Sequence, residues 1–381
     1  MSLTESGDVL HISSGERTVS VREVKVELGP RSYTIYVAAG TLGDFGYYAG
    51  RHLAGKRIMV VTNPTVGGLY GEVLRRSLTS AGFTVIWAEI PDGEAYKNLS
   101  TVAGLYDAAL DGGVERGDAV VALGGGVVGD IAGFLAATYM RGVALVQVPT
   151  TLLAQVDSSV GGKVGVNHPR AKNIIGAFYQ PFFVFIDVRT LASLPDREVR
   201  AGLAEVIKYG VIKDAEFFQW LETNIERLLK LEPPALEYAV SVSCRIKAAV
   251  VSADEKEEGI RAILNFGHTV GHALEAVTVY HRFVHGEAVG VGMAAAGRLA
   301  ADLGFFDKTG VESITALINR AGLPSEIPPD IPIEELLEAV HRDKKVSDSQ
   351  LTFVFPEAIG RVRIVRGVPV AAVRAVVTAS K

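Results

Sequence analysis

The chain has 381 residues, enough for two domains that each bury a hydrophobic core. Its net charge of -5 and pI of about 6.0 leave no basic face, so no nucleic-acid partner is expected. The chain has a single cysteine, Cys244, which favours a reducing compartment. Its N-terminus has no basic, apolar signal sequence, and its apolar runs are too short to span a bilayer. These features predict a cytoplasmic protein without a membrane partner. Residues 1–20 are polar and unpatterned, and we expect a flexible N-terminal arm there.

Residues 21–187 are expected to form an α/β domain, which is a candidate for binding a nucleotide. Apolar runs bounded by turn residues predict strands at 23–28, 33–37, 57–62, 84–90, 119–123, 143–148 and 183–186. Helix-period segments at 66–81 and 99–112 separate several of them. Buried runs that alternate with helices are typical of a Rossmann-like, mostly parallel sheet.

Residues 188–381 are expected to form a mostly helical domain that closes over the first. Apolar periodicity predicts helices at 198–212, 235–255, 262–277, 287–303, 311–321 and 333–341. A late pair of runs at 351–355 and 361–365 predicts a small hairpin. We expect the active site in the cleft between the two domains.

A glycine motif follows the strand at 119–123. Gly124, Gly126 and Gly129 satisfy the pattern G-x-G-x-x-G, in which backbone N–H groups at a helix start meet a pyrophosphate. A tight turn between strand and helix is the alternative explanation. The motif follows about the third parallel strand, and no acidic residue stands at the usual distance after it. The carboxylate for the ribose is therefore expected from the loop 91–98, which contains Glu94.

Histidines cluster further along the chain. His268 and His272 are four residues apart, so on a helix both leave the same face, and His285 follows. Neutral imidazole suits zinc, and a catalytic zinc takes about three protein ligands. Packed or solvated histidines are the alternative. Glu205 and Lys208, three residues apart, indicate either a helical ion pair or a carboxylate that completes the metal site.

A second polar stretch runs from 149 to 163 and is followed by Lys172 and Asn173. Glycines beside Lys163 could form a cradle for a phosphate group. A surface loop with solvated lysines is the alternative.

Taken together, these segments resemble the 3-dehydroquinate synthase family. The resemblance rests on residues 124–130, 149–163, 204–210, 264–273, 285–289 and 343–345, in unbroken order between about 23 and 365. It implies a homodimeric lyase of the shikimate pathway that uses NAD and zinc, with cobalt as the alternative metal. Such an enzyme converts 3-deoxy-D-arabino-heptulosonate 7-phosphate to 3-dehydroquinate and phosphate, by transient oxidation, β-elimination, re-reduction, ring opening and aldol closure.

The resemblance also implies roles for individual residues. The metal ligands would be Glu205, His268 and His285, with His272 as a substrate-contacting catalytic group, although spacing alone makes it the partner of His268. The phosphate group would be held by Lys163, Asn173, Asn265, His272 and a lysine of the Lys344–Lys345 pair, taken as Lys345. The ring hydroxyls would contact Asp157 and Lys208, and the carboxylate Lys247 and Arg261. NAD would be lined by Glu94, Lys97, Gly125, Gly126, Val127, Asp130, Thr150, Thr151 and Lys172. Arg141 would reach the active site of the partner subunit.

Three other functions would require different residues. Related sugar phosphate cyclases, of the 2-deoxy-scyllo-inosose or 2-epi-5-epi-valiolone synthase type, act on substrates without a carboxylate, and Lys247, Arg261 and Asn265 argue against them. Metal-dependent polyol dehydrogenases tend to place an aspartate where this chain has Glu205. A non-catalytic binding protein would be expected to have lost at least one of Glu205, His268, His272 and His285, and this chain retains all four.

Overall fold

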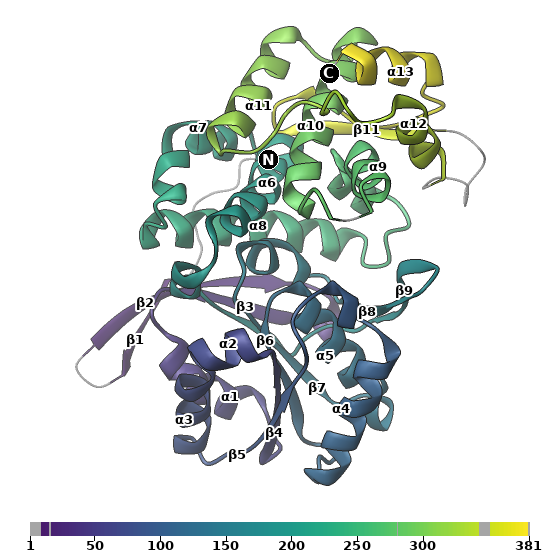
Figure 1. Ribbon diagram of the computed structural model, residues 1–381. Coiled ribbons are helices and arrows are strands. Elements are labelled where there is room, and N and C mark those ends of the chain that lie inside the picture. The colour runs from purple at the N-terminus through teal and green to yellow at the C-terminus, as the bar shows by residue number, and fades with distance from the viewer. Residues whose placement is uncertain (1–8, 15–16, 280, 343–350, 380–381) are drawn as a thin grey trace. The chain divides into compact units, whose positions relative to one another are not determined.

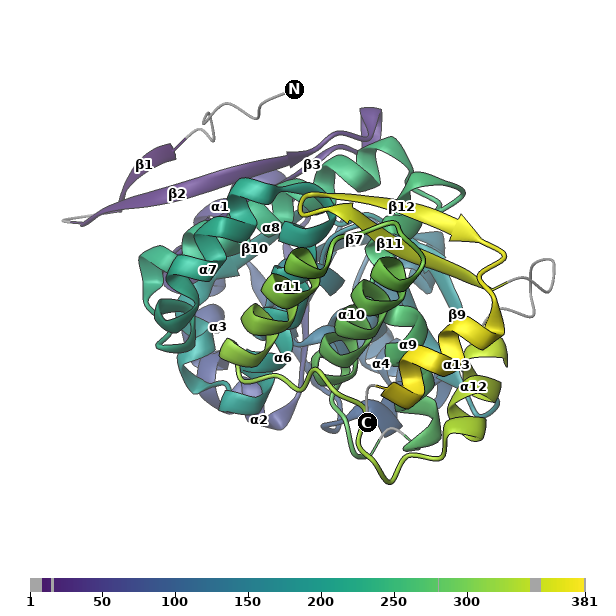
Figure 2. The same ribbon diagram turned by 90° about the horizontal axis from the view of Figure 1, so that it is seen from above.

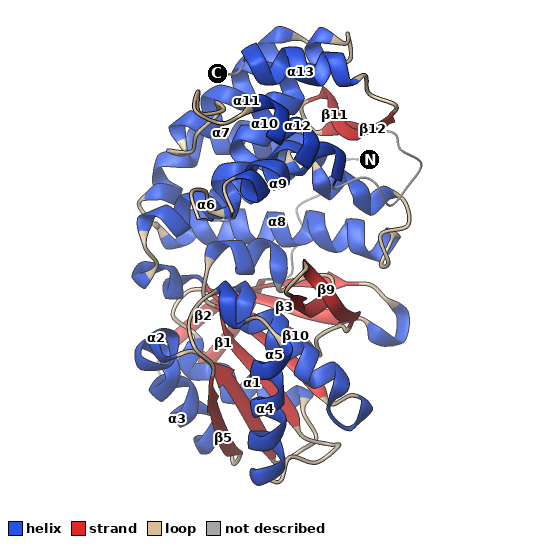
Figure 3. Ribbon diagram, turned by 45° about the vertical axis from the view of Figure 1, so that its right-hand side comes forward, coloured by secondary structure: helices blue, strands red, loops and turns tan. Residues whose placement is uncertain are grey.

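The computed structural model describes residues 9–14, 17–279, 281–342 and 351–379. Within them the chain divides into two compact units. The first comprises Met1–Leu194 and Leu236–Ser252, and the second comprises Pro195–Ala235 and Ala253–Lys381. In Figure 3 the strands of the large sheet belong to the first unit, and the second unit consists of helices and one hairpin.

An eight-stranded sheet forms the first unit, in the order β1-β2-β3-β10-β7-β6-β4-β5. The six strands from β3 to β5 in that order run parallel, and β1 and β2 add an antiparallel edge. The strands are β1 (Val9–Ser14), β2 (Arg17–Val26), β3 (Tyr33–Ala38), β4 (Arg57–Thr62), β5 (Thr84–Glu89), β6 (Ala119–Gly124), β7 (Ala144–Pro149) and β10 (Phe183–Asp187).

Helices cover both faces of this sheet because successive side chains of a strand point to opposite sides. Ile58 and Val60 of β4 pack with α1 (Phe45–His52) and α3 (Glu72–Ser80), whereas Met59 and Val61 pack with α4 (Leu99–Asp111) and α5 (Gly126–Thr138). Figure 1 shows the two helix pairs on opposite sides. The central β6 is buried over its whole length, as expected for a parallel strand that is covered twice.

Two further segments complete the first unit. A separate hairpin, β8 (Lys163–His168) and β9 (Ala171–Phe178), packs with α5. Residues 236–252 of α8 (Pro233–Ala253) also belong here. Cys244 of this helix is buried and donates its thiol to the Gln155 carbonyl at 3.3 Å, and burial raises the pKa of the thiol to about 12.

The second unit is built around α10 (His285–Asp302), which packs against α6 (Asp196–Lys213), α9 (His268–Val277) and α11 (Lys308–Arg320). Figure 2 shows α10 between α9 and α11. Strand β11 (Thr352–Ala358) also packs against α10 and pairs with β12 (Arg361–Arg366). The remaining helices are α7 (Ala215–Leu229), α12 (Ile333–Arg342) and α13 (Val370–Ala379).

The α/β fold class is confirmed, and the expected strands of the large sheet are present, although β2 begins and ends earlier than predicted. β1 and the first residues of β2 lie within residues 1–20, where a flexible arm was expected. The prediction of a helix at 262–277 is wrong for its first residues. Residues Ile260–Asn265 form a 3-10 helix, Gly267 adopts a left-handed conformation with φ 81°, and α9 begins only at His268. In the described part of the chain, no helix has the length and apolar character needed to cross a membrane.

Candidate active site

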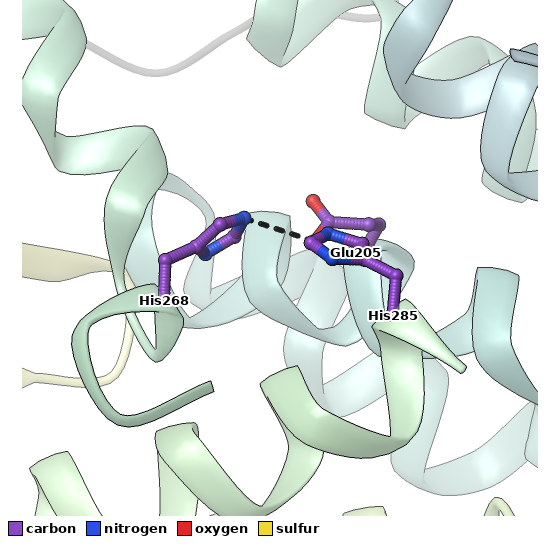
Figure 4. Close-up of side chains that lie close together, drawn as sticks. All are labelled: Glu205, His268 and His285. Atoms are coloured by element: carbon purple, nitrogen blue, oxygen red, sulfur yellow. Dashed lines mark ion pairs between the residues drawn. The ribbon is translucent and has the colours of Figure 1, made fainter. Parts of the chain in front are cut away.

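Three potential metal ligands of the second unit come from three helices. Glu205 lies in the middle of α6, His268 begins α9 and His285 begins α10. Glu205 Oε1 lies 3.7 Å from His268 Nε2 and 3.8 Å from His285 Nε2, and Figure 4 shows the three side chains together. These separations are too long for hydrogen bonds, but they suit ligands of one ion, because zinc lies about 2.0–2.2 Å from each ligand atom.

The surroundings of Glu205 also fit a cation. Its side chain is fully buried, and Oε1 accepts no hydrogen bond from any residue that the structure describes. Lys208, one turn later in α6, forms an ion pair with Oε2. Burial of a carboxylate without hydrogen bonds is strongly unfavourable. A divalent ion beside Oε1 would supply the missing interaction, so the donor set fits a metal such as zinc or cobalt.

The surroundings of His268 favour the neutral form of its ring with the Nε2 atom unprotonated. The left-handed Gly267 turns the backbone immediately before it, and a side chain at Gly267 would come within 2.6 Å of Met293. His268 Nδ1 lies 3.1 Å from the Phe266 carbonyl oxygen, an arrangement that leaves Nε2 free of its proton. Burial, with the nearby charge of Lys208, lowers the pKa of His268 well below its usual value. The neutral ring is the form that binds metal.

His272 lies near the same ligands but in a different group. Its ring centroid is 5.2 Å from that of His268 and 6.1 Å from that of His285. It forms a second set of potential ligands with Glu275 and His285. The structure therefore brings the three histidines together, and it separates His272 from the group that contains Glu205.

Arg261 and Asn265 belong to the 3-10 helix that precedes Gly267. Arg261 is buried, and its guanidinium donates to the Glu255 carbonyl. Asn265 donates its amide to Glu257 Oε1 at 3.0 Å. Both side chains are thus oriented by contacts within the second unit.

The glycine motif forms the turn between β6 and α5. A side chain at Gly124 would come within 2.7 Å of Val128, and one at Gly125 within 3.0 Å of Thr151. Thr150 donates its backbone N–H to the Gly124 carbonyl at 3.0 Å. The turn and the end of β7 therefore approach each other closely because the glycines have no side chains. This contact gathers Gly125, Gly126, Val127, Thr150 and Thr151.

The buried side chain of Lys97 is the centre of a polar cluster in the first unit. Its Nζ donates to Asp130 Oδ2 and to Asn173 Oδ1, both at 2.5 Å. Asn167 donates to Glu94 Oε1 at 2.7 Å and accepts the Asn173 backbone N–H at 2.8 Å. Burial raises the pKa of Asp130 above its usual value, and the charge of Lys97 opposes that shift. Residues expected at NAD and at phosphate thus share one network.

Asn167 was missed by the sequence analysis. It lies in β8, and its backbone N–H donates to the Lys97 carbonyl at 2.8 Å, where an isolated bridge joins Asn98 to Asn167. The only sequence signal was a polar residue among the apolar residues before the Lys172–Asn173 pair. A contact with a loop some seventy residues earlier cannot be inferred from that signal.

Other expected site residues of the first unit lie as follows. Lys247 donates to the Asp157 backbone carbonyl at 2.6 Å and to its Oδ1 at 2.8 Å. Lys163 begins β8 and Lys172 lies in β9, both exposed. Arg141 is exposed and has a positive φ of 66°. Lys345 lies outside the described residues.

Comparison with protein families places these residues in a known context. The model described as 3-dehydroquinate synthase N-terminal matches residues 87–201, and the model described as 3-dehydroquinate synthase C-terminal matches residues 202–346.

Solved structures supply the fold comparison. A 2-deoxy-scyllo-inosose synthase complexed with carbaglucose-6-phosphate, NAD+ and Co2+ is 27% identical, with a TM-score of 0.85 over 94% of this chain and 100% of the other. A 2-epi-5-epi-valiolone synthase from Streptomyces hygroscopicus with NAD+ and Zn2+ bound is 28% identical, with a TM-score of 0.84 over 93% and 97%.

Full-length relatives are much more similar in sequence. The chain is 58% identical to the 3-dehydroquinate synthase of Pelotomaculum thermopropionicum, covering 90% of this chain and 93% of that protein. It is 52% identical to the 3-dehydroquinate synthase of Desulforamulus reducens, covering 93% of this chain and 99% of that protein. These identities, over nearly the whole length of both proteins, exceed the 27% and 28% identity to the two synthases of known structure. The chain therefore belongs to the 3-dehydroquinate synthase family.

Proposed function

We propose that the chain is a 3-dehydroquinate synthase, which converts 3-deoxy-D-arabino-heptulosonate 7-phosphate to 3-dehydroquinate and phosphate. The observation that carries the proposal is the buried Glu205 carboxylate, which faces His268 and His285 in a chain 58% identical to a curated synthase of that name. The reaction has no net oxidation, since the substrate is oxidised and reduced again within one turnover.

NAD and a divalent metal ion, zinc or cobalt, are the proposed cofactors. When bound, the ion polarises the hydroxyl group that is oxidised, and NAD takes up and returns a hydride. The ion would be held by Glu205, His268 and His285. The dinucleotide would lie on the turn after β6 and the Lys97 cluster, contacting Glu94, Lys97, Gly125, Gly126, Val127, Asp130, Thr150, Thr151 and Lys172.

The substrate would be positioned by charged groups that the protein already orients. Arg261 presents a planar guanidinium, which suits a carboxylate, and the Glu255 carbonyl holds one side of it in place. Lys247 would contact the same carboxylate. Asp157 and Lys208 would contact the ring hydroxyls. Orientation by fixed groups lowers the entropy cost of reaching the reactive geometry.

The phosphate group would be held by Lys163, Asn173, Asn265, His272 and Lys345. Oxidation of a ring hydroxyl group to a ketone makes the C–H beside the new ketone acidic. That proton can then pass to the departing phosphate as the C–O bond to the phosphate breaks. These side chains would keep the phosphate oxygen beside the proton that it accepts. The Asn173 side chain contacts Lys97, which links this role to the proposed cofactor cluster.

A homodimer is also proposed, with Arg141 reaching the active site of the partner subunit. Arg141 is exposed, and both it and the preceding Met140 have left-handed backbone conformations. Sedimentation of the purified chain measures the assembly state. Loss of activity in Arg141→Ala without loss of the dimer would support the role in the partner's site.

One assay tests the proposed reaction. The purified chain, supplied with NAD and zinc, is offered 3-deoxy-D-arabino-heptulosonate 7-phosphate, glucose 6-phosphate or sedoheptulose 7-phosphate, while phosphate release and NADH are followed. We expect phosphate release from the heptulosonate alone and no accumulation of NADH. Phosphate release from another sugar phosphate would indicate a different cyclase, and stoichiometric NADH would indicate a polyol dehydrogenase.

A further inference from the structure

A carboxylate outside the proposed ligand set lies beside His285. Glu275 is in α9, seven residues after His268, so the two side chains leave the same face of the helix two turns apart. It is buried, with 9% of its surface exposed. Its Oε1 lies 3.5 Å from His285 Nδ1. The contact thus joins the last turn of α9 to the first residue of α10.

The two histidine ligands have matching surroundings. Each directs Nε2 toward Glu205 Oε1, at 3.7 Å for His268 and 3.8 Å for His285. On its other side, each ring places Nδ1 near an oxygen acceptor, which is the Phe266 carbonyl for His268 and the Glu275 carboxylate for His285. In a neutral imidazole only one nitrogen carries a proton. An acceptor at Nδ1 keeps that proton there and leaves Nε2 for the metal.

We propose that Glu275 is a positioning residue of the metal centre, which fixes the tautomer and the ring orientation of His285 without binding the ion itself. The proposal rests on the proposed function, because it presumes a metal at Glu205, His268 and His285. Carboxylates that accept the second N–H of a histidine ligand commonly raise metal affinity about 10- to 100-fold.

The same atoms allow one alternative. His272, Glu275 and His285 also lie close enough together to bind an ion among themselves. That ion would have to take His285 Nδ1, which then could not carry a proton toward Glu275. With His285 Nε2 facing Glu205, a second ion would also require the ring to lose both protons. We therefore favour the positioning role, and metal stoichiometry tests the alternative.

Two variants of the full chain distinguish the loss of the acceptor oxygen from the loss of side-chain volume. Glu275→Met removes the acceptor but keeps a long, helix-compatible side chain, and Glu275→Gln keeps an acceptor oxygen. Glu312→Ala, at an exposed position of α11, is the control. The metal-free proteins are titrated with Co2+, and affinity, stoichiometry and the visible spectrum of the ion are recorded.

We expect one Co2+ per chain, bound about 10- to 100-fold more weakly by E275M and within about threefold of wild type by E275Q and E312A. The visible spectrum should change in E275M, while the melting temperature of its metal-free form should match that of wild type. Histidine nitrogen shifts of the metal-free proteins should show His285 protonated at Nδ1 in wild type but not uniformly so in E275M.

Several results would overturn the inference. Unchanged Co2+ affinity in E275M would remove its basis, and so would equal losses in E275M and E275Q. A metal-free E275M that melts well below wild type would assign Glu275 a structural role. A second Co2+ that E275M loses would establish the alternative site. If wild type itself binds no Co2+, the proposed metal centre fails and the inference fails with it, whereas intact wild-type binding with unaffected variants defeats the inference alone.

Discussion

His268 and His272 are one helical turn apart in α9, yet they belong to different ligand groups. We predict that His268→Ala abolishes both metal binding and turnover, because it removes a nitrogen that faces the buried Glu205. His272→Ala should keep the metal and lower the rate about 10²-fold, because it removes a side chain that would position the phosphate group. Metal content and phosphate release measure the two effects. Equal metal loss in both variants would contradict the ligand assignment.

Asn167 makes the second residue-level prediction. Asn167→Ala should weaken NAD binding about tenfold, because it releases Glu94 and the Asn173 backbone from their hydrogen bonds, each of which contributes about 1 kcal/mol. Calorimetric titration with NAD measures the effect. His168→Ala, exposed at the next position, is the control. A variant with wild-type affinity for NAD would show that this network does not position the cofactor.

At this scale the sequence was most informative where function requires particular residue types. Glycines, histidines and a lysine within motifs identified the turn after β6 and the ligands Glu205, His268 and His285, which the structure brings together. Their assignment as ligands stays a prediction. Asn167 and Glu275 were missed because each is an ordinary polar residue until another segment of the chain lies beside it.

At the scale of elements, the contact between α9 and α10 depends on glycine. A side chain at Gly292 would come within 1.8 Å of the Gly267 carbonyl, directly before His268. We predict that Gly292→Ala lowers the free energy of unfolding by about 3 kcal/mol, through overpacking, and weakens metal binding by displacing His268. Thermal or urea unfolding and Co2+ titration measure these changes.

The control lies in the same helix. At Gly297 the nearest atom to an added side chain is Val311 Cγ2, at 3.9 Å, an ordinary contact distance. Gly297→Ala should therefore keep metal affinity and increase stability by up to about 1 kcal/mol, because alanine favours helix. If the two variants were equally destabilised, the close contact between α9 and α10 would not depend on glycine at position 292.

The buried strands of the large sheet were predicted well, whereas α7 and the elements that depend on tertiary contacts were not. The strands β4, β5, β6, β7 and β10 lie within one or two residues of their predicted positions. The hairpin of β8 and β9 was missed because Gly165 and Gly176 pair there at close range, in strands with few consecutive apolar residues. The predicted helix at 262–277 is interrupted by Gly267, which has a left-handed conformation and lies where α10 leaves no room for a side chain.

For the whole molecule, the first compact unit includes a segment that is remote from the rest of it in sequence. Residues 236–252 of α8 join the first unit, where Cys244 contacts Gln155 and Lys247 contacts Asp157. Helical periodicity predicts that α8 exists and which face is apolar, but it does not say which unit covers that face. The predicted domains, 21–187 and 188–381, are each contiguous, so they do not place this segment in the first unit.

Because all three proposed ligands belong to the second unit, metal should stabilise that unit selectively. An ion at a hundred times its Kd stabilises the state that binds it by about 2.7 kcal/mol. We predict slower amide exchange in α6, α9 and the first turn of α10 when zinc is added. Amides of β4, β6 and β7 should be unaffected, because the first unit has hydrophobic clusters of its own on both sheet faces.

Hydrogen exchange with mass spectrometry measures this pattern peptide by peptide. His268→Ala serves as the control, and zinc should leave its exchange unchanged in both units, since Glu205 and His285 come from helices that the missing imidazole no longer joins through the ion. Protection confined to α9 and α10, without α6, would remove Glu205 from the ligand set. Equal protection in both units would show instead that they unfold together, so that binding energy gained at three side chains is shared by the whole chain.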